Sequence, residues 1–409
     1  MPAPISRQDA VRKLLRLARP VEARAVPPKD GIGLVAARNV AALCDVPEHA
    51  CSVRDGYAVR SEDVSRARSL DPVRLAVNGC LRAESANPPS IEPGTAVRVL
   101  TGGPVPPGAD AVFAEEDVEE TDGHILVREP VRPGWYVRAA GGEIARDTVI
   151  TPAGAPITPQ AAAIMTRTRV ASVPAHPRPR TRLLALGSEL AKPGAAEDDG
   201  DHPGTMHFPA DNLVLQRGLF EAAGAVVERT GVIPDDRDRL VAALSAPDLP
   251  EILVTTGGTG NSERDFAFEA AQQAGFTPVF HRIDIRPGRN MFTAVRNQTL
   301  LFGLPGPPAA GHACFHAIIL PVIRRLRGLP DPETPRTAQF TQAINARPGS
   351  EWLVQCALEI QGSTLTATPL AGKTVPPMLG LAQAHGLAVL QSGQTITPGD
   401  ETEILTTLF

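Results

Sequence analysis

The stretch Glu251–Asp265, EILVTTGGTGNSERD, decides the fold. Its apolar first part, Ile252–Thr256, is rich in β-branched residues, which predicts a strand buried on both faces. Gly257 and Gly258 end that strand, and alanines at helical spacing follow as far as Gly275. In a strand, loop and helix of this kind, the loop amides and the helix N-terminus converge on one spot that suits a phosphate. A tight connection without a ligand is an equal alternative, because neither GxGxxG nor a P-loop motif is present.

Outward from this stretch, strand and helix patterns alternate between Arg180 and Leu329. Alternation of this kind predicts a doubly wound α/β domain with a parallel sheet. Such domains bind ligands beyond the carboxyl ends of their strands. Three loops lie at these ends: 187–189, 234–236 and 257–265. We therefore expect the functional site to form where these three loops meet.

Short β patterns separated by proline and glycine occupy the flanking segments. They recur between Val73 and Val149, which predicts an inserted β domain, and again from Pro330 to Phe409, which predicts a small all-β module. Ser6–Ala18 reads as one amphipathic helix. Pro174–Pro179 is a plausible linker before the α/β domain.

Composition limits the class of protein. The chain has 409 residues, a net charge of −5 and only 4% aromatic residues, which argues against a nucleic-acid binder and favours small-molecule chemistry. No apolar run reaches membrane-spanning length, and the N-terminus lacks the apolar core of a signal peptide, so we expect no membrane contact and a cytoplasmic location. The five scattered cysteines form no CxxC pair, which indicates neither disulfides nor a cysteine zinc site.

Seven motifs occur in the order and spacing of one known family. They are SVRDGYAV, TGGPVPPGADAVFAEE, GSELAKPG, GVIPDD, TTGGTG followed by E-x-D, RPGR and GLPGPP. Together they extend over nearly the whole chain and resemble molybdopterin molybdenumtransferase, the family of MoeA and the gephyrin E domain. The resemblance implies an enzyme of molybdenum cofactor synthesis. It would insert molybdate into adenylylated molybdopterin and release AMP with the help of Mg²⁺.

The resemblance also implies an architecture, an elongated multidomain subunit of the α/β plus β class that forms a homodimer. The implied parts are an N-terminal linker and dimerisation domain (1–50 and 141–175), an inserted β domain (51–140), a doubly wound molybdopterin-binding α/β domain similar to MogA and MoaB (176–329), and a C-terminal β-barrel domain (330–409). Other proteins of cofactor synthesis are further expected partners.

Family roles can be carried over residue by residue. The resemblance implies the catalytic residues Asp55, Thr101, Glu189, Asp235, Asp236, Glu263 and Asp265, of which Asp236, Glu263 and Asp265 would bind Mg²⁺. It implies the cofactor-binding residues Gly257, Gly258, Thr259, Gly260, Ser262, Arg286, Arg289, Pro305 and Pro308. In the family, Asp55 and Thr101 reach the cleft of the partner subunit. Carboxylates suit Mg²⁺, and dianionic molybdate needs counter-charges, for which Arg264, Arg286 and Arg289 are the natural candidates.

The sequence departs from the family at several polar positions. The family motif KPGKP is replaced by Arg286, Arg289 and Asn290, Pro307 stands where GLPGNP has asparagine, and Ser188 stands where GDEL has aspartate. The family's YDSN stretch has no clear counterpart in MHFPADN. Two alternatives therefore stay open. One is a paralogue that binds a pterin nucleotide or a partner without catalysis, and the other is an enzyme of the same fold that acts on another nucleotide.

Several of these residues also have a purely structural interpretation. Asp235 and Asp236 precede a helical pattern, where aspartates commonly cap the helix. Asp55 stands in an Asp-Gly turn. His312 and His316 have helical spacing but lack the HExxH pattern, so packed or surface histidines are expected and not a zinc pair.

Overall fold

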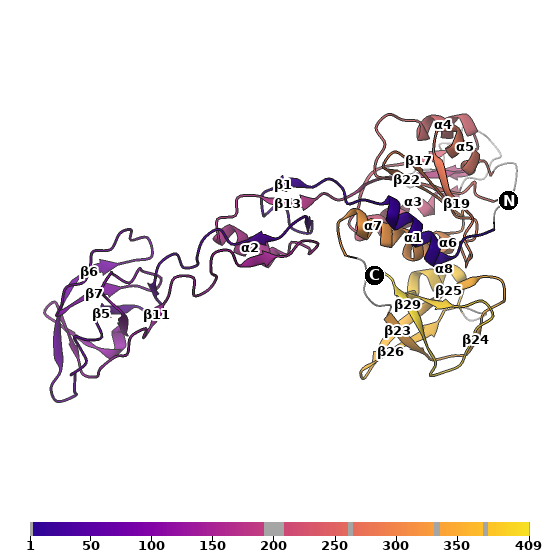
Figure 1. Cartoon of the computed structure of the whole chain (residues 1–409). Coiled ribbons are helices and arrows are strands. Elements are labelled where there is room, and N and C mark those ends of the chain that lie inside the picture. The colour runs from indigo at the N-terminus through magenta and orange to yellow at the C-terminus, as the bar shows by residue number, and fades with distance from the viewer. Residues whose placement is uncertain (1–2, 192–207, 261–264, 331–335, 371–374, 409) are drawn as a thin grey trace. The chain divides into compact units, whose positions relative to one another are not determined.

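The chain forms two compact units. The computed structural model describes residues 3–191, 208–260, 265–330, 336–370 and 375–408. One unit is Ala25–Pro174, and the other combines Met1–Arg24 with Ala175–Phe409. Helix α1 (Arg7–Leu17) therefore belongs to the same unit as the C-terminal half of the chain (Figure 1).

A six-stranded sheet forms the centre of the larger unit. Its order is β17 (Val226–Ile233), β14 (Arg180–Leu186), β18 (Ile252–Thr256), β22 (Thr299–Leu304), β21 (Phe292–Arg296) and β19 (Thr277–His281). The first four strands are parallel, which confirms the predicted doubly wound α/β class. The sheet is mixed, however, because β21 runs antiparallel to β22. Only Asn297 and Gln298 separate these two strands, too few residues for the crossover that parallel strands need.

Strand β18 separates two hydrophobic cores, and all five of its residues are buried. Ile252 and Val254 face one core, and Leu253 faces the other. The first core contains α1, α3 (Asp211–Ala222), α6 (Pro308–Cys314), a π-helical turn (Phe315–Ile319) and α7 (Leu320–Leu326). The second contains α4 (Arg237–Leu244) and α5 (Ala267–Gln273). The predicted burial of this strand on both faces is therefore confirmed.

The last strands of the chain close into a barrel. The barrel strands are β25 (Glu351–Gln361), β26 (Thr364–Pro369), β23 (Arg336–Phe340), β29 (Glu401–Thr406) and β27 (Gly386–Leu390), and β25 pairs with both β26 and β27. The short strand β20 (Ile285–Arg286) adds to β25 from the α/β part. Helix α8 (Pro377–Gln383) and the pair β24 (Ile344–Asn345) and β28 (Thr395–Ile396) complete this region.

An ion-pair cluster joins α1 to the barrel. Arg7 Nε lies 2.5 Å from Glu351 Oε1, and its Nη2 lies 3.2 Å from Glu403 Oε2. The Arg7 guanidinium is largely buried, so both carboxylates are needed to offset its loss of hydration. This cluster fixes strands β25 and β29 against the N-terminal helix.

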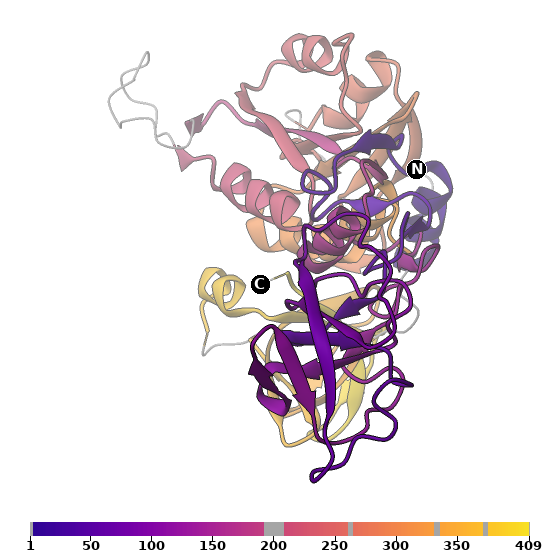
Figure 2. The same ribbon diagram turned by 90° about the vertical axis from the view of Figure 1, so that its left-hand side faces the viewer.

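The smaller unit is dominated by a second six-stranded sheet, drawn in purple in Figure 2. Its order is β8 (Ala111–Ala114), β5 (Gly56–Val59), β7 (Thr95–Val99), β6 (Val73–Leu81), β10 (His124–Val127) and β9 (Glu119–Thr121). The remaining elements are β1 (Arg24–Val26), β2 (Val35–Ala36), β3 (Val40–Ala41), β4 (Cys51–Ser52), β11 (Val137–Arg138), β12 (Val149–Thr151), β13 (Val173–His176), a 3₁₀ turn (Glu115–Asp117) and α2 (Pro159–Arg167).

Each of the five cysteines, all within the described ranges, is unpaired. Among the described residues, no helix is long and apolar enough to cross a membrane.

Candidate functional site

A cleft of about 670 Å³ opens at the carboxyl ends of the parallel strands. It lies where the three loops that follow β14, β17 and β18 were predicted to meet. The loop after β22 also contributes to it. The lining residues are Leu186, Glu189, Leu190, Phe208, Pro209, Asp211, Asn212, Asp235, Thr256, Gly257, Gly258, Asp265 and Gly306. Leu190 begins β15 (Leu190–Ala191), and Phe208 begins β16 (Phe208–Pro209).

The glycine loop is shaped by close packing at the end of β18. Gly257 has φ +89°, and a Cβ there would lie 2.8 Å from the carbonyl oxygen of Leu186. The Gly257 N–H donates to Leu304 O at 3.0 Å, and the Ala267 N–H donates to Gly258 O at 3.1 Å. Gly257 therefore allows the close approach of Leu186, and its N–H is occupied within the sheet and offers no hydrogen bond to the cleft.

Acidic side chains predominate among the described residues of the cleft. Four carboxylates line it, those of Glu189, Asp211, Asp235 and Asp265, and no arginine, lysine or histidine is among the described lining residues. Three of these acids were predicted from the sequence, and the structure brings them together. Asp211 was missed, because an aspartate that opens a helical pattern is indistinguishable from a helix cap.

The adjacent aspartates after β17 have different positions. Asp235 lines the cleft, where its N–H donates to Ser188 Oγ at 2.9 Å and its Oδ2 accepts from the Ser188 N–H at 3.4 Å. Asp236 caps α4 by accepting from the Arg239 N–H at 3.0 Å, and it lies 3.3 Å from Arg239 Nε. Asp236 is not among the lining residues. Its predicted metal-binding role stays a prediction.

Asn212 is a second cleft residue that sequence reasoning missed. Its Nδ2 donates to Gly306 O at 2.5 Å, which ties α3 to the loop between Pro305, after β22, and Pro308, the first residue of α6. Its Oδ1 is buried and has no hydrogen-bond partner within the described part of the chain. A buried amide oxygen without a partner is costly, and a cation or a ligand N–H would satisfy it. An asparagine therefore lies at the site although the sequence has no clear YDSN motif.

Other predicted residues either lie outside the described part of the chain or are not among the residues that line this cleft. Ser262, Glu263 and Arg264 lie outside the described residues. Thr259 is buried, and a Cβ on Gly260 would meet Asp265 Oδ2 at 2.7 Å. Arg286 lines a different cavity, and Arg289 is exposed and lines neither. Of the counter-charges predicted for an anionic ligand, Arg286 and Arg289 are thus not among the residues that line the described cleft.

Asp55 and Thr101, in the smaller unit, are hydrogen-bonded to each other. Asp55 Oδ1 accepts from the Thr101 hydroxyl at 2.7 Å and from the Thr101 N–H at 2.6 Å. Both bonds hold the pKa of Asp55 below its ordinary value, and the bond from the hydroxyl has the larger effect. The pair therefore presents an ionised carboxylate.

His312 and His316 form a buried, neutral pair. Their ring centroids lie 4.5 Å apart. Burial lowers the pKa of His312 to about 4 and that of His316 to about 3. Among the described residues, no three histidine, cysteine, aspartate or glutamate side chains lie close enough together to hold a metal ion by themselves. The pair is packed, as the sequence indicated.

Two protein-family models match this chain. The family described as the MoeA N-terminal region (domain I and II) matches residues 5–168. The family described as a probable molybdopterin binding domain matches residues 184–325, which include the acidic cleft. The two matches together extend over more than half of the 409 residues.

Whole-length relatives agree with these matches. The chain is 31% identical over 392 residues to molybdopterin molybdenumtransferase 2 of Mycobacterium tuberculosis, and the aligned residues cover 93% of this chain and 93% of the relative. It is 28% identical over 397 residues to molybdopterin molybdenumtransferase of Bacillus subtilis, covering 95% of this chain and 91% of the relative. A solved structure of the molybdopterin biosynthesis MoeA protein from Pyrococcus horikoshii has a TM-score of 0.84 at 23% identity and covers 100% of both chains, which supports the fold.

The Asp55–Thr101 pair yields a measurable pKa. Thr101→Val removes the hydroxyl but keeps the backbone donor, so the pKa of Asp55 should rise part of the way to its ordinary value. A ¹³C NMR titration of the Asp55 carboxyl measures this change. Thr101→Ser keeps a hydroxyl and should leave the pKa low. An unchanged pKa in Thr101→Val would show that the hydroxyl does not stabilise the carboxylate.

Proposed function

The chain belongs to the MoeA family of molybdopterin molybdenumtransferases, and from that premise we propose that it inserts molybdate into adenylylated molybdopterin and releases AMP. The acidic cleft of the α/β region is the proposed site of this reaction. It lies in the part of the chain that matches the molybdopterin-binding family, at the edge of the sheet where such folds bind ligands.

The observation that carries the proposal is the charge of the cleft. Four carboxylates are among its described lining residues, and they repel a phosphate that enters alone. A divalent cation that enters with the substrate phosphates offsets the repulsion between the phosphates and the carboxylates. Mg²⁺ suits such a site because it prefers oxygen ligands and usually keeps several waters. Two carboxylates and a substrate phosphate therefore suffice to hold it.

The described residues of the cleft can take separate roles in binding the cation and the substrate. We assign Asp265 and Asp235 to the cation, since both line the cleft from loops that the sheet holds in place. When bound, Mg²⁺ would neutralise charge on the phosphates and on the departing AMP. Asn212 lines the cleft beside them, and its Nδ2 holds the loop at Gly306 in place. Gly257 and Gly258 line the cleft, and we assign their backbone to the side that the substrate contacts.

Asp55 and Thr101 enter the proposal as residues of a partner subunit. We propose a homodimer in which this pair completes the acidic cleft of the other copy, as the family resemblance implies. Their mutual hydrogen bonds support the proposal, because they keep one ionised carboxylate fixed in place. A binding protein without catalysis is the second candidate. It would bind the pterin nucleotide and release no AMP.

Removal of one carboxylate tests the metal assignment. The chain, adenylylated molybdopterin, molybdate and Mg²⁺ are incubated, and AMP release and active cofactor are followed. Asp265→Asn should raise the Mg²⁺ concentration for half-maximal rate about tenfold or more, since a ligand is lost. Asp238→Asn makes the same chemical change on the exposed first turn of α4, away from the cleft lining, and should match the unaltered protein. Wild-type binding without AMP release would reject the transferase function, and an unchanged Mg²⁺ requirement in Asp265→Asn would reject the metal assignment.

Subunit mixing tests the shared site. At a limiting Mg²⁺ concentration, Asp55→Ala and Asp265→Asn should each be much less active than the unaltered protein, because each alters one half of every cleft. Random exchange between the two variants should restore roughly a quarter of wild-type activity, since half the dimers carry one intact cleft of two. As a control, Asp55→Ala is taken through the same exchange procedure alone and should gain no activity. If mixing restores nothing while dimers exchange normally, the pair does not act across subunits.

A further inference from the structure

Polar side chains meet between helices α3 and α6, which pack against each other in the larger unit (Figure 1). Asn212 and Gln216 belong to α3, His312 belongs to α6, and His316 belongs to the π-helical turn that follows. The side chains of Gln216, His312 and His316 are buried. This helix contact therefore contains polar groups at positions that apolar side chains usually fill.

Four buried polar atoms of Asn212, Gln216 and His312 have no hydrogen-bond partner among the described residues. They are Asn212 Oδ1, Gln216 Nε2, Gln216 Oε1 and His312 Nδ1. A buried polar group without a partner destabilises the folded state, and most such groups in native proteins are paired. Four of them in one helix contact favour an arrangement in which they pair with one another.

Gly311 of α6 locates two of these atoms. A Cβ at Gly311 would lie 2.9 Å from Gln216 Nε2 and 3.8 Å from Asn212 Oδ1, so a donor and an acceptor flank the same point. Asn212 and Gln216 are also one turn apart on the same face of α3, a spacing at which such side chains form hydrogen bonds. Rotation about the last bond of a glutamine is soft, so Gln216 Nε2 can reach Asn212 Oδ1.

His312 follows Gly311 in the chain and supplies the complementary group. Burial lowers the pKa of His312 to about 4, so near pH 7 its ring is neutral and has one N–H donor. With the proton on Nδ1, this donor suits Gln216 Oε1. His316 packs against the His312 ring, with the ring centroids 4.5 Å apart. The four atoms are thus two donors and two acceptors that can satisfy one another.

Asn212 connects these side chains to the acidic cleft. It lines the cleft, and its Nδ2 donates to Gly306 O at 2.5 Å. Gly306 is itself a lining residue. An amide that is bonded at both its oxygen and its nitrogen cannot turn away from Gly306, because either bond would break. The buried pairs therefore hold one wall of the cleft in place before a substrate arrives.

We propose that Gln216 and His312 are positioning residues for the acidic cleft: His312 Nδ1–H donates to Gln216 Oε1, Gln216 Nε2 donates to Asn212 Oδ1, and Asn212 in turn holds Gly306. The two buried hydrogen bonds do not depend on the reaction. Their effect on substrate binding rests on the proposed function, and the two parts are tested separately.

Thermal unfolding of the full chain tests the buried hydrogen bonds without an assay of activity. Gln216→Met is close in volume and removes both polar ends of the amide. It leaves Asn212 Oδ1 and His312 Nδ1 unpaired, so the unfolding midpoint should fall by about 2 °C or more. Gln272→Met makes the same change at an exposed position of α5 and should leave the midpoint unaltered. If Gln216 had no partners, its removal would raise the midpoint or leave it unchanged, and either result would overturn the proposal.

A double variant tests the pairing of Gln216 with His312. His312→Leu alone should also lower the midpoint, because it leaves Gln216 Oε1 unpaired. Gln216→Met with His312→Leu leaves only Asn212 Oδ1 unpaired, so its midpoint should fall by clearly less than the sum of the two single changes. Additive changes would show that the two side chains are not bonded to each other.

Calorimetric titration with adenylylated molybdopterin and Mg²⁺, without molybdate, tests the effect on the cleft. Gln216→Met should weaken binding about fivefold, and in an Asn212→Leu background it should weaken binding no further, because Gln216 acts through Asn212. The Mg²⁺ concentration that supports half-maximal binding should not change, since Asp235 and Asp265 are unaltered. A lowered midpoint with unchanged affinity would overturn the positioning role. Absence of binding by the unaltered chain would reject the proposed function, and the unfolding experiments then decide the buried pairs by themselves.

Discussion

Burial of β18 on both faces is the constraint on which the larger unit depends. A strand with Ile252 and Val254 in one core and Leu253 in the other cannot shift its register without moving apolar side chains into the wrong layer. Its carboxyl end is therefore fixed, and Gly257 can turn there because it alone tolerates the close approach of Leu186. The acids of the neighbouring loops are held at the same edge. The geometry of the cleft is thus a consequence of core packing.

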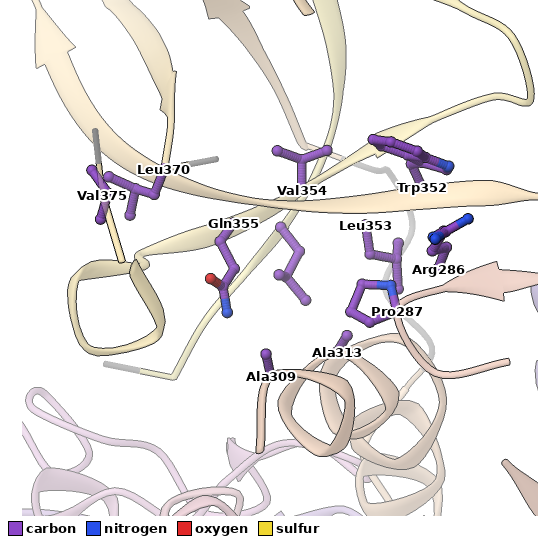
Figure 3. Close-up of a pocket in the computed structure, with 11 residues that line it drawn as sticks. Arg286, Pro287, Ala309, Ala313, Trp352, Leu353, Val354, Gln355, Leu370 and Val375 are labelled. Carbon is purple, nitrogen blue, oxygen red and sulfur yellow. The ribbon is translucent and has the colours of Figure 1, made fainter. Parts of the chain in front are cut away.

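The cleft beyond the sheet differs in charge from another cavity, the barrel cavity, which lies between the barrel and α6 (Figure 3). Four carboxylates are among the described lining residues of the cleft, whereas those of the barrel cavity are mostly apolar and include Arg286. The cleft suits phosphates that arrive with a divalent cation. The α6 region connects the two in the chain, because Gly306 lines the cleft and Ala309 lines the barrel cavity. A short segment therefore borders two different chemical environments.

Local patterns predicted the parts of the fold that depend on local chemistry. The β18 strand, its glycine loop and the alternation of strands and helices were visible in the sequence, and Glu189, Asp235 and Asp265 do share one cleft. The antiparallel direction of β21 was not visible, because it depends on the two-residue connection to β22. The separate positions of Asp235 and Asp236 were not visible either, because they depend on the helix cap that Asp236 forms. The location of Arg286 was also hidden, since it follows from pairing with Trp352, a residue far along the chain. The contact between Asp55 and Thr101 likewise joins residues that spacing alone does not relate.

The central claim is that substrate phosphates bind at the acidic cleft through a divalent cation. A crystal structure of the full chain with adenylylated molybdopterin and Mg²⁺, without molybdate, tests it most directly. The account predicts that the cation lies between the substrate phosphates and the carboxylates of Asp235 and Asp265, beside Gly257 and Gly258. Phosphates bound at Arg286 in the barrel cavity, with no cation at the acidic cleft, would contradict it.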